Sequence, residues 1–121
     1  MFLVTSNQAR QLLLMRYGDR VTAKQLKAGH SDLQAQLAEM PPGFNLLADF
    51  SQLESMAADC APEVGAGMEL IDAARPGLLV RVIPDPSKDI GLNILTAFHY
   101  KKRPRIVNCR TLAEAARVLE L

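Results

Sequence analysis

The clearest hydrophobic pattern of the chain lies between Leu78 and Cys109. It opens on an apolar run, LLVRVI, which only Arg81 interrupts. Such a run is typical of a strand that is covered on both faces. Pro84 and Pro86 end the run, because each proline fixes its own φ and disfavours helix at the preceding residue.

A helix and a second strand are predicted after this turn. Ser87 is placed to accept a free backbone N–H of the first helical turn, and Asp89 adds negative charge where the helix dipole favours it. The four-residue spacing of Ile90, Ile94 and Phe98, with Leu95 alongside, predicts one buried helical stripe. Residues 105–109 predict a short strand. The unit therefore predicts two parallel strands joined by a right-handed helical crossover.

Two short apolar runs near the N-terminus predict two adjacent strands. They are residues 2–5 and 12–15, separated by a polar turn at residues 7–10. The alternative is one helix from Gln8 to Tyr17, since Leu, Met, Gln and Arg all favour helix and Asn7 is able to cap it.

A break at Gly18 and Asp19 is expected before the strongest helix signal of the chain. Thr22 and Gln25 have the spacing of a capping box, in which each side chain satisfies a backbone N–H of the other residue. The hydrophobic staple and the buried stripe are expected from Val21, Leu26, Leu33, Leu37 and Met40. The residues PPG at 41–43 end this helix.

The middle of the chain predicts a strand, a loop and a helix. Residues 44–50, FNLLADF, are too apolar for a sheet with one wet face. A loop is expected at residues 51–59, with Asp59 as the cap of a helix at about residues 60–74. The apolar anchors of the loop are Leu53 and Met56, and the buried stripe of the helix is Val64, Met68 and Ile71.

A second capping box, Thr111 to Glu114, begins the last predicted helix. Its inward side chains are expected to be Leu112, Ala115, Ala116 and Leu119. The full order is β-β-α-β-α-β-α-β-α, which predicts an α/β fold with an open mixed sheet and helices packed on it. The length of 121 residues, without a repeat or a linker, predicts one domain over residues 1–121.

The amino-acid composition argues against several classes of protein and of function. The chain is 49% hydrophobic and 22% charged, which describes a globular domain and argues against disorder. A net charge of +1 gives no global field that would favour nucleic acid or an anionic membrane. No apolar run approaches the ~20 residues that span a bilayer, and the N-terminus lacks a signal-peptide pattern. The two cysteines form neither a disulfide framework nor a paired metal site, so we expect a cytoplasmic protein without metal or cofactor.

The element order and the segment LLADFSQLESMAADCAPEVGAGMELID together resemble the STAS domain of the SpoIIAA, anti-sigma factor antagonist type. In such domains the third strand ends in an Asp-containing segment, and a loop leads to a helix whose start carries a Ser or Thr phosphorylated by a partner kinase. The corresponding residues here are Asp49, Phe50 and Ser51, with Leu53 and Met56 at the expected apolar loop positions. The resemblance covers nearly the whole chain, and it implies a non-enzymatic module that binds another protein.

The sequence departs from this family at the phosphorylation site. Ala57 and Ala58 stand where the family has Asp-Ser or Asp-Ser-Ser, so the usual phosphoserine switch is not expected. Whether Ser51 or Ser55 replaces the missing phosphoacceptor stays open. The stretch RVIPDPSKDIGLNILTAFHY is similar to a distinct group of short bacterial STAS-like proteins whose activity is unassigned.

Polar side chains follow three of the predicted strands. Ligands of open α/β sheets gather at the carboxyl ends of the strands, so we expect these side chains to share one edge. They are Asp49, Ser51 and Asp59, then Asp85, Ser87 and Lys88, and finally Asn108, Cys109 and Arg110. Ser87, Lys88 and the helix that they open are suited to hold an anion, although helix capping explains the same residues.

Cysteine, histidine and lysine positions each have a chemical and a structural explanation, and the structural one is preferred throughout. Cys60 near a helix start and Cys109 at a strand end are either reactive thiolates or buried, inert thiols. His99 is either a base or a histidine at a helix end, and His30 has no ligand partner. The basic run of Lys101, Lys102, Arg103 and Arg105 either contacts phosphate groups or forms a solvated loop after a helix.

Two main hypotheses of function follow, and neither includes a catalytic residue. The first is a STAS-like regulatory or protein-interaction module, with partner contacts at Ser51, Ser55, Asp59, Cys60 and Glu63. The alternative is a small-molecule or anion-binding domain, which includes an unassigned enzyme, with a site formed by Asp49, Asp85, Ser87, Lys88 and Cys109. A third hypothesis is homo-oligomerisation through the N-terminal edge strand, whose unpaired backbone invites pairing.

Overall fold

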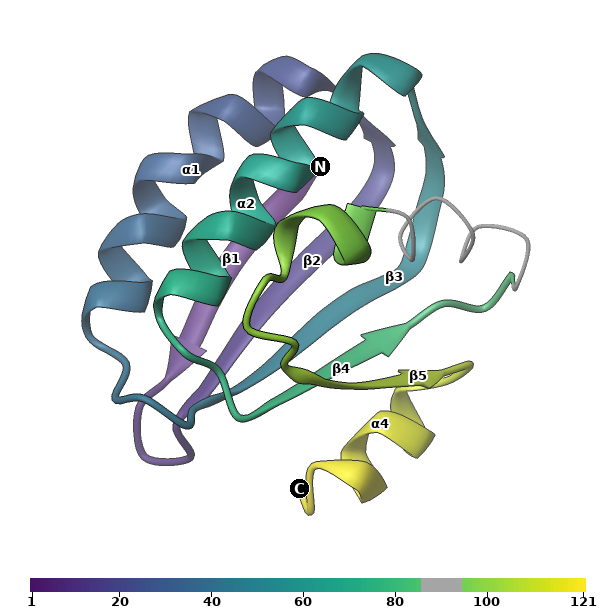
Figure 1. The fold of residues 1–121 in the computed structure, drawn as a ribbon. Coiled ribbons are helices and arrows are strands. Elements are labelled where there is room, and N and C mark those ends of the chain that lie inside the picture. The colour runs from purple at the N-terminus through teal and green to yellow at the C-terminus, as the bar shows by residue number, and fades with distance from the viewer. Residues whose placement is uncertain (86–94) are drawn as a thin grey trace.

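The computed structural model, which describes residues 1–85 and 95–121, contains a five-stranded sheet with helices on both faces (Figure 1). The elements are β1 (Phe2–Asn7), β2 (Leu12–Val21), α1 (Ala23–Ala38), β3 (Asn45–Met56), a 3-10 turn (Ala58–Cys60), α2 (Ala61–Ala73), β4 (Leu78–Val82), helical residues 95–99, β5 (Arg105–Cys109) and α4 (Leu112–Val118). We call residues 95–99 the crossover helix. The strand order is β1-β2-β3-β4-β5, with β1 antiparallel to β2 and every other neighbouring pair parallel. The predicted open mixed α/β sheet is therefore confirmed.

The helices divide the hydrophobic core into two layers. α1 and α2 lie side by side on one face of the sheet, the crossover helix lies next to α2, and α4 lies on the opposite face (Figure 1). The larger layer, beneath α1 and α2, buries residues such as Leu13, Leu33 and Phe44. The smaller layer, beneath α4, contains Val80 and Val82. Because both faces of β3 and β4 are covered, their sequences are apolar at nearly every position.

The N-terminal hairpin settles the choice between two strands and one helix. β1 pairs with residues 12–17 of β2, which also pairs in parallel with β3, so the helical alternative is wrong. The expected break at Gly18 and Asp19 is wrong as well, because β2 continues to Val21. Two register shifts against β3 absorb the irregular backbone there, including a φ of 53° at Asp19.

The capping box and the stripe of α1 are confirmed. Thr22 Oγ1 accepts the Gln25 N–H at 3.2 Å, and Gln25 Oε1 accepts the Thr22 N–H at 3.1 Å. The predicted staple and stripe residues are all buried: Val21, Leu26, Leu33, Leu37 and Met40. Gly29 lets this helix approach β1, since a Cβ there would stand 2.6 Å from the Phe2 ring.

β3 is longer than the sequence predicted. Residues 51–56, expected as loop, continue the strand and pair with the end of β2, because this ladder satisfies their backbone groups. The predicted cap is also wrong, since Asp59 lies in the 3-10 turn and the start of α2 has no side-chain cap bond. The predicted stripe of α2 is confirmed, with Val64, Met68 and Ile71 buried.

The crossover unit is confirmed as two parallel strands, but its helix is only partly as predicted. β4 and β5 pair in parallel along their whole length. The predicted positions Ser87, Asp89, Ile90 and Ile94 lie outside the described residues. Leu95 packs against the core, whereas Phe98 is 70% exposed, so its predicted burial is wrong. Leu95 meets the core and His99 meets Gly65 of α2, and the four-residue spacing of these two inward positions leaves Phe98 on the outer side.

α4 keeps the predicted cap but not the full capping box. Thr111 Oγ1 accepts the Glu114 N–H at 3.1 Å, while the Glu114 carboxylate accepts the N–H of Arg110, 3.4 Å away, instead of that of Thr111. Ala115 and Leu119 are buried and Ala116 is half-buried, as the stripe predicts. Leu112 is 41% exposed, so its predicted inward position is wrong. A helix of 7 residues covers too little of the sheet to bury both flanks of its stripe.

Candidate functional site

The predicted partner residues lie around the end of β3 and the start of α2. Ser55 and Asp59 are exposed and Glu63 is partly exposed, whereas Cys60 is only 1% exposed. Ser51 is half-buried, and its buried hydroxyl oxygen has no hydrogen-bond partner among the described residues. Three of the five residues are therefore presented to solvent. Their role in partner binding stays a prediction.

Ser55 and Asp59 belong to a set of exposed residues between the end of β3 and the start of α2, which we call the α2 face. It consists of Glu54, Ser55, Ala57, Ala58, Asp59, Ala61 and Pro62. Alanine and proline make up its centre, so a partner that binds there orders few flexible side chains. Its own charged side chains are those of Glu54 and Asp59. The α2 face thus combines a small-residue centre with carboxylates.

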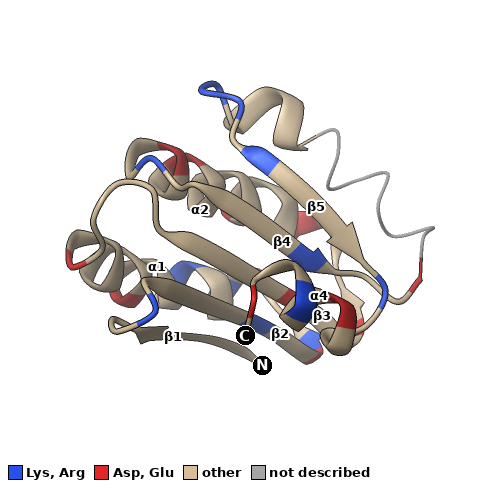
Figure 2. Cartoon of the chain, turned by 90° about the horizontal axis from the view of Figure 1, so that it is seen from below, with Lys and Arg blue, Asp and Glu red and all other residues tan. Residues whose placement is uncertain are grey.

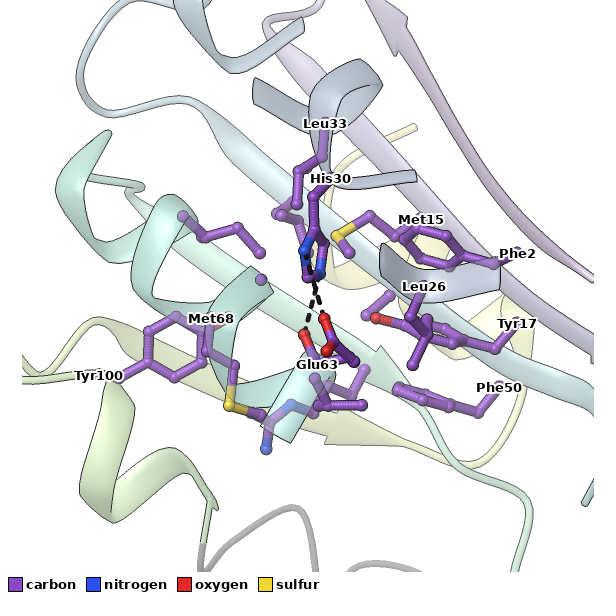
Figure 3. A pocket seen from close by; sticks show the side chains of 16 residues that line it. Phe2, Met15, Tyr17, Leu26, His30, Leu33, Phe50, Glu63, Met68 and Tyr100 are labelled. Carbon is purple, nitrogen blue, oxygen red and sulfur yellow. Dashed lines mark hydrogen bonds and ion pairs between the residues drawn. The ribbon is translucent and has the colours of Figure 1, made fainter. Parts of the chain in front are cut away.

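Glu63 connects this region to α1 through His30 (Figure 3). Its backbone oxygen lies 3.0 Å from His30 Nε2, and its Oε2 lies 3.6 Å from His30 Nδ1. The contact holds the first turn of α2 against α1. The sequence analysis found no ligand partner for His30 and did not predict this structural role.

A buried polar cluster lies beneath α2, and the sequence analysis did not find it. Arg81 is 4% exposed, its Nη2 donates to Thr96 Oγ1 at 2.6 Å, and it also hydrogen-bonds to Tyr100. Burial raises the pKa of Tyr100 to about 12 and raises that of Tyr17 further. The only sequence signal was one arginine inside an apolar strand. These contacts fasten the crossover helix to β4.

A small cavity adjoins the cluster. Its volume is about 30 Å³, and Phe2, His30, Met68, Arg81 and Tyr100 are among the side chains around it (Figure 3). This space has room for about one water molecule. It is too small for an organic ligand, and it lies between the sheet and the helices α1 and α2.

Asp49 is the most completely buried of the predicted site residues. It is 0% exposed, its Oδ2 lies 3.2 Å from Arg16 Nε, and its Oδ1 accepts the Ser51 N–H at 2.9 Å. Arg16 is on β2 directly opposite Asp49 on β3. These bonds occupy both carboxylate oxygens and fix the strand at this point.

The strand ends converge only in part. Asp49, Val82 and Cys109 form one row across β3, β4 and β5. Asp59 is not near this row, because β3 continues past Asp49 to Met56 at about 3.3 Å per residue and so carries Asp59 away from it. Asp85 is exposed after β4, Asn108 and Arg110 are exposed around the end of β5, and Ser87 and Lys88 lie outside the described residues. The row contains one buried carboxylate and one buried thiol, with Val82 of β4 between them.

The two thiols have the properties of buried cysteines. Burial raises the pKa of Cys60, and Asp59 raises it further. Burial and Glu114 raise the pKa of Cys109, which is 5% exposed. Cys60 Sγ also donates to the Val21 carbonyl at 3.5 Å. A raised pKa lowers the thiolate fraction, so the structure favours inert thiols over reactive ones.

His99 fastens the crossover helix to α2. Its ring packs directly on Gly65, and its Nδ1 lies 3.6 Å from Glu69 Oε1. A Cβ at Gly65 would collide with the imidazole. This contact places His99 between the crossover helix and α2.

Within residues 1–85 and 95–121, no group of His, Cys, Asp and Glu side chains has the arrangement of a metal site. No helix in the same ranges has the length and apolar character to cross a bilayer.

The architecture just described has matches among solved protein structures. No family model matches the sequence, and no curated protein matches it. Among solved structures, the anti-sigma factor antagonist SpoIIAA in its unphosphorylated form matches over 99% of this chain and 98% of its own, with a TM-score of 0.68 and 13% identity. The chain has the SpoIIAA-like, STAS-type fold.

Two further structures with this fold extend the comparison. An uncharacterized protein of the DUF3478 family from Shewanella loihica, which has a SpoIIAA-like fold, matches over 98% of this chain and 92% of its own, with a TM-score of 0.70 and 12% identity. An anti-sigma factor antagonist from Mycobacterium paratuberculosis matches over 100% of this chain and 94% of its own, with a TM-score of 0.61 and 17% identity. At these identities the likeness is one of fold.

Proposed function

We propose that this chain is a non-enzymatic, STAS-like regulatory module that binds a protein partner through the α2 face. The observation that carries the proposal is the fold shared with anti-sigma factor antagonists, joined to an exposed small-residue surface at the start of α2. A cytoplasmic location is part of the proposal.

The composition of the α2 face supports a role in protein binding. Ala57, Ala58, Ala61 and Pro62 supply an apolar centre, and Glu54 and Asp59 supply charge beside it. Protein interfaces commonly have such an apolar centre with a polar rim. The two contacts between Glu63 and His30 keep the first turn of α2 in place before a partner arrives. A preorganised surface loses less conformational freedom on binding.

We further propose that this module works without the phosphoserine switch of its family. Ala57 and Ala58 lack a hydroxyl, and the Ser51 hydroxyl is buried, so a kinase would have no access to it. Ser55 is the exposed serine between residues 51 and 60. Ser55 lies on β3, opposite Arg20 of β2, and not at the start of the helix, where the family carries its phosphoacceptor.

The ligand-binding alternative gains no specific support from the described residues. Both carboxylate oxygens of Asp49 are engaged by Arg16 and the Ser51 N–H, and Cys109 is buried. The cavity beneath α2 holds about 30 Å³, far below the several hundred Å³ of ordinary ligand sites.

Affinity capture from the native host tests the proposed function. Ala58→Arg places a long cation in the centre of the α2 face, and Arg117→Glu changes an exposed charge on α4, on the opposite side of the sheet. We expect a defined partner to be retained by the wild type and by Arg117→Glu and lost by Ala58→Arg, with circular dichroism unchanged in both variants. Equal capture by all three proteins would refute the α2 face as the binding surface.

A further inference from the structure

Two arginines, each followed by a proline, have an unusual backbone conformation. Arg75 is the residue after the C-cap of α2, and Arg103 ends the turn after the crossover helix, where its N–H donates to the Tyr100 carbonyl at 3.2 Å. Their φ angles are 59° and 52°. A left-handed residue after a helix is usually glycine, and a following proline favours extended backbone at the residue before it. Backbone preference therefore does not explain arginine at either position.

Both Arg–Pro pairs border the same part of the surface. A hollow of about 370 Å³ is lined by two cations, two prolines and one carboxylate, namely Arg75, Lys102, Pro76, Pro104 and Asp72. A second hollow, of about 430 Å³, shares Pro104 and is also lined by Lys101 and Arg103. Volumes of this size are ordinary for small-molecule sites. The hollows lie at the amino ends of β4 and β5, whereas the row of Asp49 and Cys109 lies at the carboxyl ends.

Positive charge is concentrated around the two hollows. Five exposed cations lie in their lining or next to it and form no ion pair within residues 1–85 and 95–121: Arg75, Lys101, Lys102, Arg103 and Arg105. Figure 2 shows the last four as a blue loop that leads into β5. The carboxylate of Asp72 is buried, and its Oδ1 accepts the backbone N–H of Lys102 at 3.2 Å. Cations after a helix also complement its dipole, but that effect does not require arginine in a left-handed conformation.

We propose that the two hollows form a binding site for a small organic molecule that carries two phosphate groups. One phosphate would bind to Arg75 and Lys102, and the other to Lys101 and Arg103, because guanidinium and ammonium groups are the usual phosphate donors in proteins. Strained backbone is retained where it serves a site, which accounts for arginine in place of glycine. Two hollows of ligand size favour a small molecule over a nucleic acid or a lipid surface. The site lies at the opposite end of α2 from the α2 face.

Inorganic pyrophosphate is the probe that tests this site, because it carries two phosphate groups and is small enough for the hollows. Inorganic phosphate and sulfate are the comparison anions. Amide chemical shifts of the nitrogen-15-labelled full chain are followed during titration at constant ionic strength. We expect saturable shifts at residues 72–76 and 96–106, with at least about tenfold weaker binding of phosphate and sulfate.

Glycine variants separate a binding role from a structural one. Arg75→Gly with Arg103→Gly removes two cations and places glycine where the backbone favours it. We expect a melting temperature equal to or above that of the wild type, and pyrophosphate binding at least about tenfold weaker. The matched control is Lys24→Ala with Arg117→Ala, which removes two exposed cations from α1 and α4 and is expected to bind pyrophosphate as the wild type does.

Four results would overturn the proposal. They are no saturable binding of pyrophosphate by the wild type, equal binding of sulfate, equal binding by the glycine variant and the control, and a lower melting temperature of the glycine variant. The last result would mean that the two arginines are retained for the fold. Binding of an oligonucleotide or of anionic vesicles without binding of pyrophosphate would overturn the proposal in favour of that ligand.

Discussion

The hydrogen bonds of Asp49 provide the sharpest test of the sheet as described. Asp49→Ala removes an acceptor of the Ser51 N–H at 2.9 Å and a contact to Arg16 at 3.2 Å. A hydrogen bond to a charged group contributes about 1.5–3 kcal/mol. The Arg16 side chain is 40% exposed, so solvent screening reduces the ion pair to roughly 0.5–1 kcal/mol. Removing a buried charge recovers part of its desolvation cost. We therefore expect a net loss of about 2–3 kcal/mol of unfolding free energy.

Two companion variants separate the hydrogen bond from the ion pair. Asp49→Asn keeps an oxygen for the Ser51 N–H and is expected to lose about half as much stability. Arg16→Ala leaves the Ser51 hydrogen bond intact and is expected to lose about 1 kcal/mol. Urea unfolding followed by circular dichroism measures all three. A cost for Arg16→Ala equal to that of Asp49→Ala would refute the reasoning, because the ion pair would then provide most of the stability.

Three further predictions follow from other contacts. Gly65→Ala is expected to lose about 1–3 kcal/mol of unfolding free energy, because its Cβ collides with the ring that docks the crossover helix. Gly67→Ala, whose Cβ meets ordinary contacts at 3.7 Å, is the matched control and is expected to be neutral or stabilising. The raised pKa values of Cys60 and Cys109 predict slow alkylation of both thiols at neutral pH. The unfolding free energy is expected to be constant below the pKa of the unfolded thiols and to fall above about pH 9, because the unfolded chain releases these protons first. Urea titrations below and above that pH measure the change. The uncharged β1 edge predicts concentration-dependent self-association, which sedimentation should detect in the wild type and not in Thr5→Lys.

Local signals were sufficient for much of the fold. The capping box of Thr22 and Gln25 and the buried stripe of α1 depend on residues three or four positions apart, which a sequence displays directly. The parallel pair β4 and β5 was predictable because both runs are apolar and a helix-length segment separates them.

Features that depend on distant partners were missed. Residues 51–56 have a mixed pattern that is typical of a loop, and only the ladder to the end of β2 makes them a strand. Phe98 follows a helical stripe, but periodicity does not tell which side of a short helix meets the core. The interactions of Arg81 with Thr96 and Tyr100 join residues more than a dozen positions apart, and no local pattern announces them.

The α2 face was predictable as a region and less so as a set of residues. The family resemblance directed attention to residues 51–63, where Ser55 and Asp59 are indeed exposed. Burial of Cys60 and of the Ser51 hydroxyl depends on packing against β2 and on the extension of β3, which the sequence did not reveal.

Site-specific photo-crosslinking in the living host tests the central claim most directly. A photoreactive amino acid at Ala58 lies on the α2 face, and the same group at Arg117 lies on α4. We predict one defined protein adduct from position 58 and none from position 117. No adduct at 58, or the same adducts from both positions, would contradict a partner-binding α2 face.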